Sequence, residues 1–295
     1  MSNETTAKKN NAWGRKKILI IAVCAVAAVL ILSLAAFLLR GFFAVQAAQI
    51  CVKRGEYSSA VEYLENAGSD KANALREYAS LRKEINSKYA QMITDFDISV
   101  FSDWRDRAAA AAESAGSLPK DIEASLLSLN EKLNFICSEY DAFYAMRPEI
   151  LELMDVFGEI NRLYTKDADG YNVTFTIAEE REKISRWEYL LTETQNYLYS
   201  LPNEDKVYLL NYLVKEAQGE IGELKSTMDR LSEREDITEF DEIRATGEGK
   251  KSFPSVESSS GVSVNLENKE EYVQYMFVGI CRTLTETLGE YYRGI

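Results

Sequence analysis

The residue types that most often carry out enzyme chemistry are scarce in this chain of 295 residues. Histidine is absent, which removes the commonest general base, the usual zinc ligand, and any Ser-His-Asp or Cys-His catalytic arrangement. Neither glycine-rich phosphate motif is present, Gly-x-x-x-x-Gly-Lys-Ser/Thr or Gly-x-Gly-x-x-Gly. Carboxylates are so frequent that no pair of them stands out. We therefore predict no enzyme activity, no cofactor, and no catalytic, cofactor-binding or metal-binding residue.

One acidic turn resembles part of a calcium-binding loop. If Gly170 is set at the sixth position of such a loop, Asp167 and Asp169 fall at the third and fifth positions. Thr165 and Thr176 then fall at the first and twelfth positions, which require an aspartate and a bidentate glutamate. The strongest ligands are missing, so we interpret the segment as an Asp-rich turn.

The four cysteines do not form a metal or redox motif. Cys24 lies in a long apolar run, and Cys51, Cys137 and Cys281 each lie in an apolar helical pattern. No Cys-x-x-Cys spacing occurs, and the pattern predicts that these three are small buried hydrophobic residues. A single disulfide among the three stays open.

The longest apolar stretch is residues 18–39, with 22 residues and no charge. A helix of that length spans roughly 33 Å, enough for the apolar core of a bilayer. We therefore predict that residues 18–39 form a single transmembrane helix in contact with the lipid bilayer. A cleaved signal peptide is the alternative, but its apolar region is usually shorter, about 7–15 residues. Trp13 before the stretch, and Phe42 and Phe43 after it, suit the two membrane interfaces.

Charge suggests an orientation for this helix. Five basic residues precede the stretch and three follow it, which favours a cytoplasmic N-terminus and an extracytoplasmic body at the cell membrane. The net charge is −13 although the first 40 residues are basic, so the remainder is strongly acidic. An acidic surface repels phosphate backbones, so we expect no nucleic-acid partner.

Residues 44–72 contain a pattern of small and aromatic residues that predicts a tight helical hairpin. It comprises Ala48, Gly55, Tyr57, Ala60, Leu64 and Ala67. The segment resembles a single tetratricopeptide repeat, in which small residues let two helices approach closely and the glycine permits the turn. Ala44 and Cys51 depart from the aromatic positions of that family, and no second copy follows. The resemblance implies the hairpin geometry and no ligand site.

A second pattern repeats at a fixed offset of 83 residues. Trp104 corresponds to Trp187, and Ser117-Leu-Pro119 corresponds to Ser200-Leu-Pro202. Each copy is typical of two helices joined by a short turn, because proline is tolerated near a helix start. We interpret the copies as two related antiparallel hairpins, over about 98–146 and 177–232. The tryptophans are then expected to be packing residues.

These patterns predict an all-α chain with a single N-terminal transmembrane helix and an extracytoplasmic bundle of antiparallel hairpins. A further helix is predicted to start at Pro148, and Thr176 with Glu179 fits the capping box of another. The predicted parts are 1–17, a cytoplasmic basic tail; 18–39, the transmembrane helix; 41–96, the tetratricopeptide-like hairpin and a long helix; 97–233, the bundle with the two related hairpins; 234–265, a flexible linker; and 266–295, a C-terminal amphipathic helix.

The expected function is interaction rather than chemistry. We expect a membrane-anchored scaffold or adaptor for protein–protein contact at the cell envelope, with the linker and the terminal helix Tyr272–Tyr291 as contact elements. That helix either docks back on the bundle or binds another chain. Two alternatives are a sensor that holds a small ligand between helices and a cytoplasm-facing coiled-coil regulator.

Overall fold

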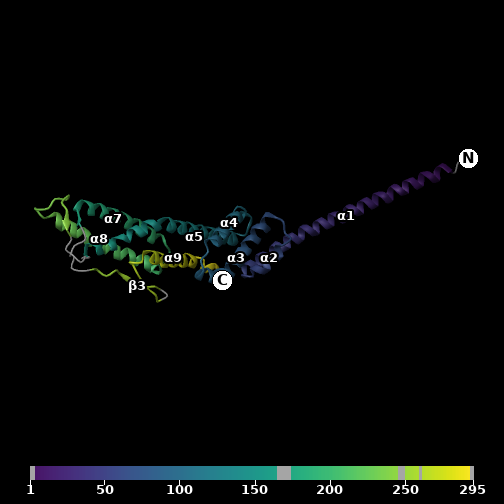
Figure 1. The fold of residues 1–295 in the computed structure, drawn as a ribbon. Coiled ribbons are helices and arrows are strands. Elements are labelled where there is room, and N and C mark those ends of the chain that lie inside the picture. Colours follow the sequence, from purple (N-terminus) through teal and green to yellow (C-terminus); the bar gives the residue numbers. More distant parts are fainter. Residues whose placement is uncertain (1–3, 165–173, 245–249, 259–260, 293–295) are drawn as a thin grey trace. The chain divides into compact units, whose positions relative to one another are not determined.

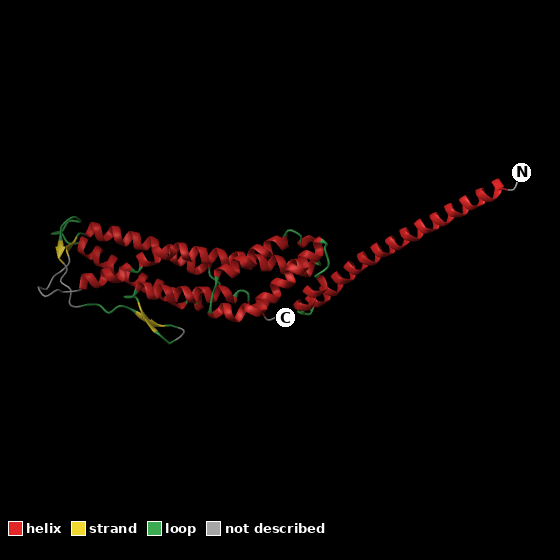
Figure 2. Ribbon diagram, turned by 45° about the vertical axis from the view of Figure 1, so that its right-hand side comes forward, coloured by secondary structure: helices red, strands yellow, loops and turns green. Residues whose placement is uncertain are grey.

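The structure is a computed structural model that describes residues 4–164, 174–244, 250–258 and 261–292 (Figure 1). Its described part is built from helices, with two short antiparallel pairs of strands (Figure 2). The predicted all-α class is therefore confirmed. The chain forms two compact units, one with Met1–Glu84 and Arg107–Leu127, the other with Ile85–Asp106 and Ser128–Gly294. Residues 107–127, which the predicted division grouped with the later bundle, fall in the first unit.

The first unit contains the hairpin expected from the tetratricopeptide-like pattern. Helix α1 (Glu4–Lys53) turns at Gly55 into helix α2 (Tyr57–Leu64). Gly55 has a φ of 74°, a conformation that suits glycine because it has no Cβ atom. Ala48 and Ala60 are completely buried, so the two helices approach closely where the sequence places small residues.

Helix α1 changes its surroundings along its length. Between Val23 and Leu34, the large apolar side chains that the structure describes are 60–68% exposed. From Val45 onward the same helix buries residues against α2, among them Ala48 and Val52. Over the part of the chain that the structure describes, no helix combines the length and the apolar character that a membrane crossing needs.

The part of helix α3 (Asp70–Thr94) up to Glu84 belongs to the first unit. Arg82 is buried on α3, and its guanidinium donates a hydrogen bond of 2.9 Å to the hydroxyl of Tyr78. Arg107 pairs with two α3 carboxylates, at 2.6 Å from Glu77 and 2.8 Å from Glu84. Both guanidinium groups thus contact side chains on the part of α3 that belongs to the first unit.

Both predicted related hairpins are helix–turn–helix segments in the structure. Helix α4 (Ile98–Ala112) leads through the 3-10 turn η1 (Ala115–Ser117) into α5 (Lys120–Leu153). Helix α7 (Ile177–Ser200) leads through η2 (Glu204–Lys206) into α8 (Tyr208–Ser232). Corresponding positions are buried in both copies: Trp104 and Trp187, and Leu118 and Leu201. That the copies arose by duplication stays a prediction.

The prediction that a helix starts at Pro148 is wrong. Helix α5 continues through Pro148 to Leu153, and the break comes at Met154, before α6 (Asp155–Tyr164). Proline removes one backbone N–H from the helical ladder but does not by itself end a helix. Pro148 is exposed, so water can bond the carbonyl that loses its partner.

The start of α7 agrees with its predicted signal. Thr176 Oγ1 accepts a hydrogen bond from the backbone N–H of Glu179, and the Glu179 carboxylate accepts one from the backbone N–H of Thr176, each at 3.2 Å. This reciprocal pair is a capping box. Just before it, β1 (Thr174–Phe175) pairs antiparallel with β2 (Ile243–Arg244).

The predicted flexible linker, residues 234–265, contains regular structure instead of a uniform coil. Besides β2 it forms a hairpin of β3 (Ser255–Glu257) and β4 (Ser263–Asn265), in register at Val256 and Val264. The hydroxyl of Tyr208 on α8 donates a 2.7 Å hydrogen bond to the Glu257 carbonyl. The charged and small residues gave no signal for this strand pair, which two α8 tyrosines bond: the Tyr212 hydroxyl likewise donates a hydrogen bond to the Ser255 carbonyl, at 3.2 Å.

The C-terminal helix docks within its own unit. It is divided into α9 (Lys269–Glu286) and the short α10 (Gly289–Tyr292). The Tyr272 hydroxyl donates a 2.8 Å hydrogen bond to the Leu209 carbonyl on α8, and Lys206 pairs with Glu286 at 2.7 Å. The apolar stripe predicted for this helix is buried, including Met276, Ile280, Leu284 and Leu288. Of the two alternatives for this helix, docking back on the bundle is therefore the one that the structure shows, and contact of the helix with another chain stays a prediction.

Candidate functional site

Three groups of side chains stand out in the described residues by exposure, charge or stacking. The α1–α2 groove lies on the outer side of the first hairpin. The Glu180 cluster consists of Glu159, Arg162, Glu180 and Lys183. The aromatic stack consists of Phe96, Phe101, Tyr140 and Tyr144.

The α1–α2 groove has a volume of about 1270 Å³ and belongs entirely to the first unit. One wall is a stretch of α1, residues 40–47, and the other is formed by the outer face of α2, the turn that follows it and the start of α3. The second wall consists of Ser59, Glu62, Tyr63, Asn66, residues 67–69 and Lys71. Since α2 buries Tyr57, Ala60 and Leu64 on its inner face, the groove is formed by the side chains left on its outer face.

The groove combines exposed aromatic rings with charge. Phe42 and Phe43 are 59% and 64% exposed on α1, and Tyr63 is 54% exposed on α2. Arg40 and Lys71 contribute two cations to the lining against the single carboxylate of Glu62. An occupant with an apolar portion and a negatively charged group would match this lining.

The Glu180 cluster joins α6 to the first two turns of α7. The Glu180 carboxylate is only 1% exposed and lies 2.8 Å from the Lys183 ammonium and 3.0 Å from the Arg162 guanidinium. Lys183 also lies 3.0 Å from Glu159, and Arg162 pairs with the same Glu159 oxygen. Two carboxylates therefore share two cations.

The pKa values of the two carboxyl groups in this cluster are shifted in opposite directions. Burial raises the pKa of Glu180 above its ordinary value, and the hydrogen bond from Lys183 only partly opposes this. Burial also acts to raise the pKa of Glu159, but hydrogen bonds from Arg162 and Lys183 outweigh it and lower that pKa. Glu180 Oε2 is buried and has no hydrogen-bond partner within the described residues, which agrees with its raised pKa.

A raised carboxyl pKa is a feature of many general acids, but this one lacks access. A substrate cannot reach a side chain whose exposure is 1% without rearrangement of α6 and α7. We therefore interpret the Glu180 cluster as a connection between two helix ends.

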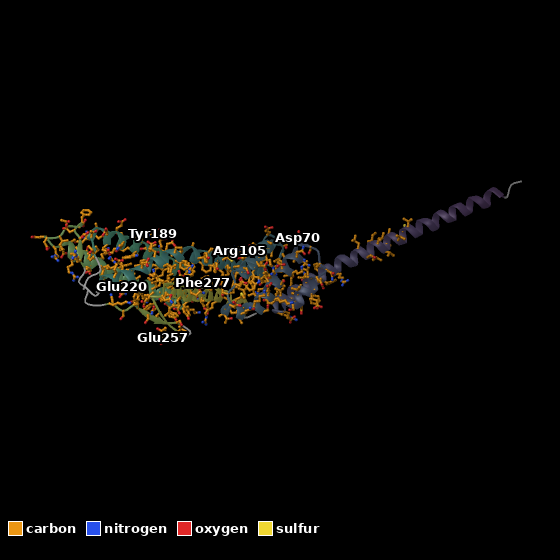
Figure 3. All side chains as sticks on the ribbon, in the orientation of Figure 1. Asp70, Arg105, Tyr189, Glu220, Glu257 and Phe277 are labelled. Carbon is orange, nitrogen blue, oxygen red and sulfur yellow. The ribbon has the colours of Figure 1, made fainter. Side chains whose placement is uncertain are left out.

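The aromatic stack belongs to the second unit and runs from the core to the surface. Buried Phe101 stacks on Phe96 at 4.9 Å between centroids, Phe96 on Tyr140 at 5.7 Å, and Tyr140 on Tyr144 at 6.4 Å. The outermost ring, Tyr144, is 64% exposed. Phe277 of α9, labelled in Figure 3, meets Tyr140 edge-on at 5.6 Å.

The Asp-rich turn and the cysteines complete the residues that the sequence singled out. Asp167, Asp169 and Gly170 of the Asp-rich turn lie outside the described residues. Within the described part, no group of three or more His, Cys, Asp or Glu side chains could hold a metal ion. Cys51, Cys137 and Cys281 are buried with free thiols, which agrees with the predicted packing role.

Sequence reasoning identified none of the three groups as a unit. The spacing of Tyr140 and Tyr144, one helical turn apart, was the available signal for the outer end of the stack. Glu159 and Glu180 come from different helices, so no local spacing indicates that they meet.

The described residues thus form an all-α helical bundle that carries an amphipathic groove in its first unit and an aromatic stack with an exposed end in its second. Comparison with known proteins found no matching family model, no matching curated protein and no matching solved structure. The likeness of residues 44–72 to a tetratricopeptide repeat is thus a local one, and it carries no function to this chain.

Proposed function

We propose that the chain is a membrane-anchored, extracytoplasmic adaptor that holds an acidic helical body at the cell envelope for contact with another protein. The observation that carries the proposal is the change along α1. The large apolar side chains between Val23 and Leu34 that the structure describes are 60–68% exposed, whereas Val45, Ala48 and Val52 further along the same helix are buried. Lipid is the environment in which such an uncovered apolar helix is stable.

The extent of the anchor is proposed from the sequence. Residues 18–39 form an uncharged stretch, and the side chains of 18–22, 25 and 35–39 lie outside those the structure describes. The backbone of α1 is one helix from Glu4 to Lys53, so an anchor would connect to the hairpin without a flexible joint. Such a connection would confine the body near the membrane and raise the effective concentration of a partner there.

The exposed end of the aromatic stack is the proposed partner surface in place of the terminal helix. Tyrosine is enriched at protein interfaces because it buries a large rigid area with little loss of side-chain entropy. Stacking on Tyr140 holds the ring of Tyr144 in position before a partner arrives. The surface is proposed for protein contact, with no catalytic step.

Membrane anchoring is tested by alkaline extraction of cell membranes. We expect the full chain to stay in the membrane pellet and a chain lacking residues 1–39 to be released. Release of the full chain by alkali would contradict the anchor.

Orientation is tested separately by cysteine labelling of intact cells. A membrane-impermeant maleimide should label Lys83→Cys, on the exposed surface of α3, and not Ser2→Cys. The opposite pattern would favour the cytoplasm-facing alternative.

The adaptor role is tested by cross-linking in cells followed by purification with the anchor intact. We expect one or more specific proteins to be recovered, and Tyr144→Ala to reduce their yield about fivefold, as for loss of a central aromatic contact. Tyr199→Ala is the matched control, because Tyr199 is 68% exposed on α7 and stacks on no other ring among the residues that the structure describes. Equal recovery from both variants would exclude the aromatic stack as the partner surface.

A further inference from the structure

The groove wall on α1 begins where the apolar stretch ends. Residues 40–47 line the groove, and residue 39 is the last of the uncharged run. With a rise of about 1.5 Å per residue, this wall covers the first ~12 Å of α1 beyond that run. The headgroup layer on each side of a bilayer is about 5–8 Å thick, so the lower part of the groove would lie within it.

The lining matches the chemistry of that layer. Phe42 and Phe43 are more than half exposed, and aromatic rings favour the boundary between acyl chains and headgroups. Arg40 and Lys71 give the groove two cations against one carboxylate, although the chain as a whole has a net charge of −13. A guanidinium binds phosphate oxygens in a bidentate manner. A local basic lining in an acidic protein indicates a negatively charged occupant.

We propose that the α1–α2 groove binds one glycerophospholipid, with its phosphate between Arg40 and Lys71 and the upper part of its acyl chains against Phe42 and Phe43. The proposal rests on the membrane anchor proposed above, because the anchor brings the groove to the depth of the headgroups. The bound lipid fixes the hairpin against the membrane surface. A protein occupant would have to displace the lipid that already surrounds this part of α1.

The test uses the full chain in lipid nanodiscs that contain a photoactivatable phosphatidylglycerol with its reactive group at the top of an acyl chain. After irradiation, cross-linked peptides are mapped by mass spectrometry. We expect labelling of residues 59–71, which run from α2 through the following turn to the start of α3, in addition to the anchor. A photoactivatable diacylglycerol, which lacks phosphate, should label residues 59–71 several-fold less. Equal labelling by the two lipids would overturn the role of the phosphate.

Paired variants test the basic lining. Arg40→Gln with Lys71→Gln should reduce phosphatidylglycerol labelling of residues 59–71 about thirtyfold, because each cation near a lipid surface contributes roughly 1 kcal/mol and 1.4 kcal/mol corresponds to about tenfold. Arg54→Gln with Lys83→Gln is the matched control, because it makes the same charge change at exposed residues outside the groove lining. Equal loss in both pairs would mean general electrostatic attraction and would overturn the site. Circular dichroism checks that each variant is folded. Ser59→Trp fills the groove without a change of charge, so it should also reduce phosphatidylglycerol labelling of residues 59–71.

Failure of this proposal is distinguishable from failure of the anchor. If residues 18–39 are labelled but residues 59–71 are not, the anchor stands and the lipid site is wrong. If the chain does not co-elute with nanodiscs at all, the anchor itself is wrong. Disulfide formation between two copies of a Tyr63→Cys variant, in place of lipid labelling, would assign the groove to a second copy and overturn the lipid.

Discussion

The guanidinium of Arg82 lies over the ring of Tyr57, with its Cζ atom 4.8 Å from the ring centroid. This contact joins α3 to the first residue of α2, and Arg82 is only 6% exposed. Burial raises the pKa of Tyr57, while the nearby Arg82 charge acts in the opposite direction. A neutral phenol ring and a buried cation therefore hold the short helix α2 in place.

Substitution of Arg82 should destabilise the first unit. Arg82→Met removes a cation–π contact and the hydrogen bond to Tyr78, so we expect the free energy of unfolding to fall by about 1–3 kcal/mol. The free energy of unfolding of Arg82→Lys should lie between those of wild type and Arg82→Met, because an ammonium keeps the charge without the planar group. Thermal unfolding of the full chain in non-ionic detergent measures this. Arg54→Met, at an exposed position, is the control, and an equal loss from it would contradict a special role for Arg82.

The Glu180 cluster predicts opposite pH effects from two carboxylates. Because the pKa of Glu180 is raised in the folded state, its ionisation destabilises the fold, and this contribution improves as the pH falls through that pKa. Glu159 has a lowered pKa, so the stability that it contributes at neutral pH is lost as the pH falls. The free energy of unfolding of Glu180→Gln, relative to wild type, should therefore be lower at pH 4 than at pH 7. For Glu159→Gln the same difference should be higher at pH 4 than at pH 7.

Urea unfolding of both variants across pH 4–7 checks these signs. Glu182→Gln serves as the control for removal of a carboxylate, because Glu182 is exposed on α7, the helix that carries Glu180. If the Glu180 and Glu159 variants change with pH in the same direction, the assignment of the two carboxyl groups is incorrect.

Trp104 should tolerate phenylalanine better than alanine by a wide margin. Its side chain is 1% exposed, and its indole N–H has no hydrogen-bond partner within the described residues. Trp104→Phe removes that unsatisfied donor, which offsets part of the lost volume, so we expect a change within about 1 kcal/mol. Trp104→Ala leaves a cavity and should cost about 3–5 kcal/mol. Chemical denaturation measures both, and a large loss from Trp104→Phe would indicate that an acceptor for the indole N–H is present.

The three buried cysteines should be unreactive in the folded protein. Burial raises the pKa of Cys281 to about 12, so almost no thiolate exists at pH 8. Burial likewise raises the pKa values of Cys51 and Cys137. In a Cys24→Ala background, Ellman's reagent should react slowly with the native chain. In guanidinium chloride it should react with all three thiols and release three equivalents of thionitrobenzoate per chain. Fast reaction before denaturant is added would show that these thiols are accessible.

The sequence alone determined the features that depend on neighbouring residues. The uncharged run at residues 18–39, the helical periods, the turns before Pro119 and Pro202, and the capping box at Thr176 are local patterns, because helix formation and capping involve residues within about one turn. The small residues Ala48 and Ala60 likewise predicted a close helix pair, since adjacent elements joined by a short turn must pack on one another.

Only the tertiary structure decided which distant surfaces meet. It brought Glu159 to Glu180, stacked Phe96 on Tyr140, ordered the strand pair after α8 and docked α9 in its own unit. An apolar stripe or a carboxylate has the same sequence pattern whether it packs in its own chain, faces lipid or binds a partner. The choice depends on the total burial and charge pairing of the folded chain, and no local pattern contains that sum.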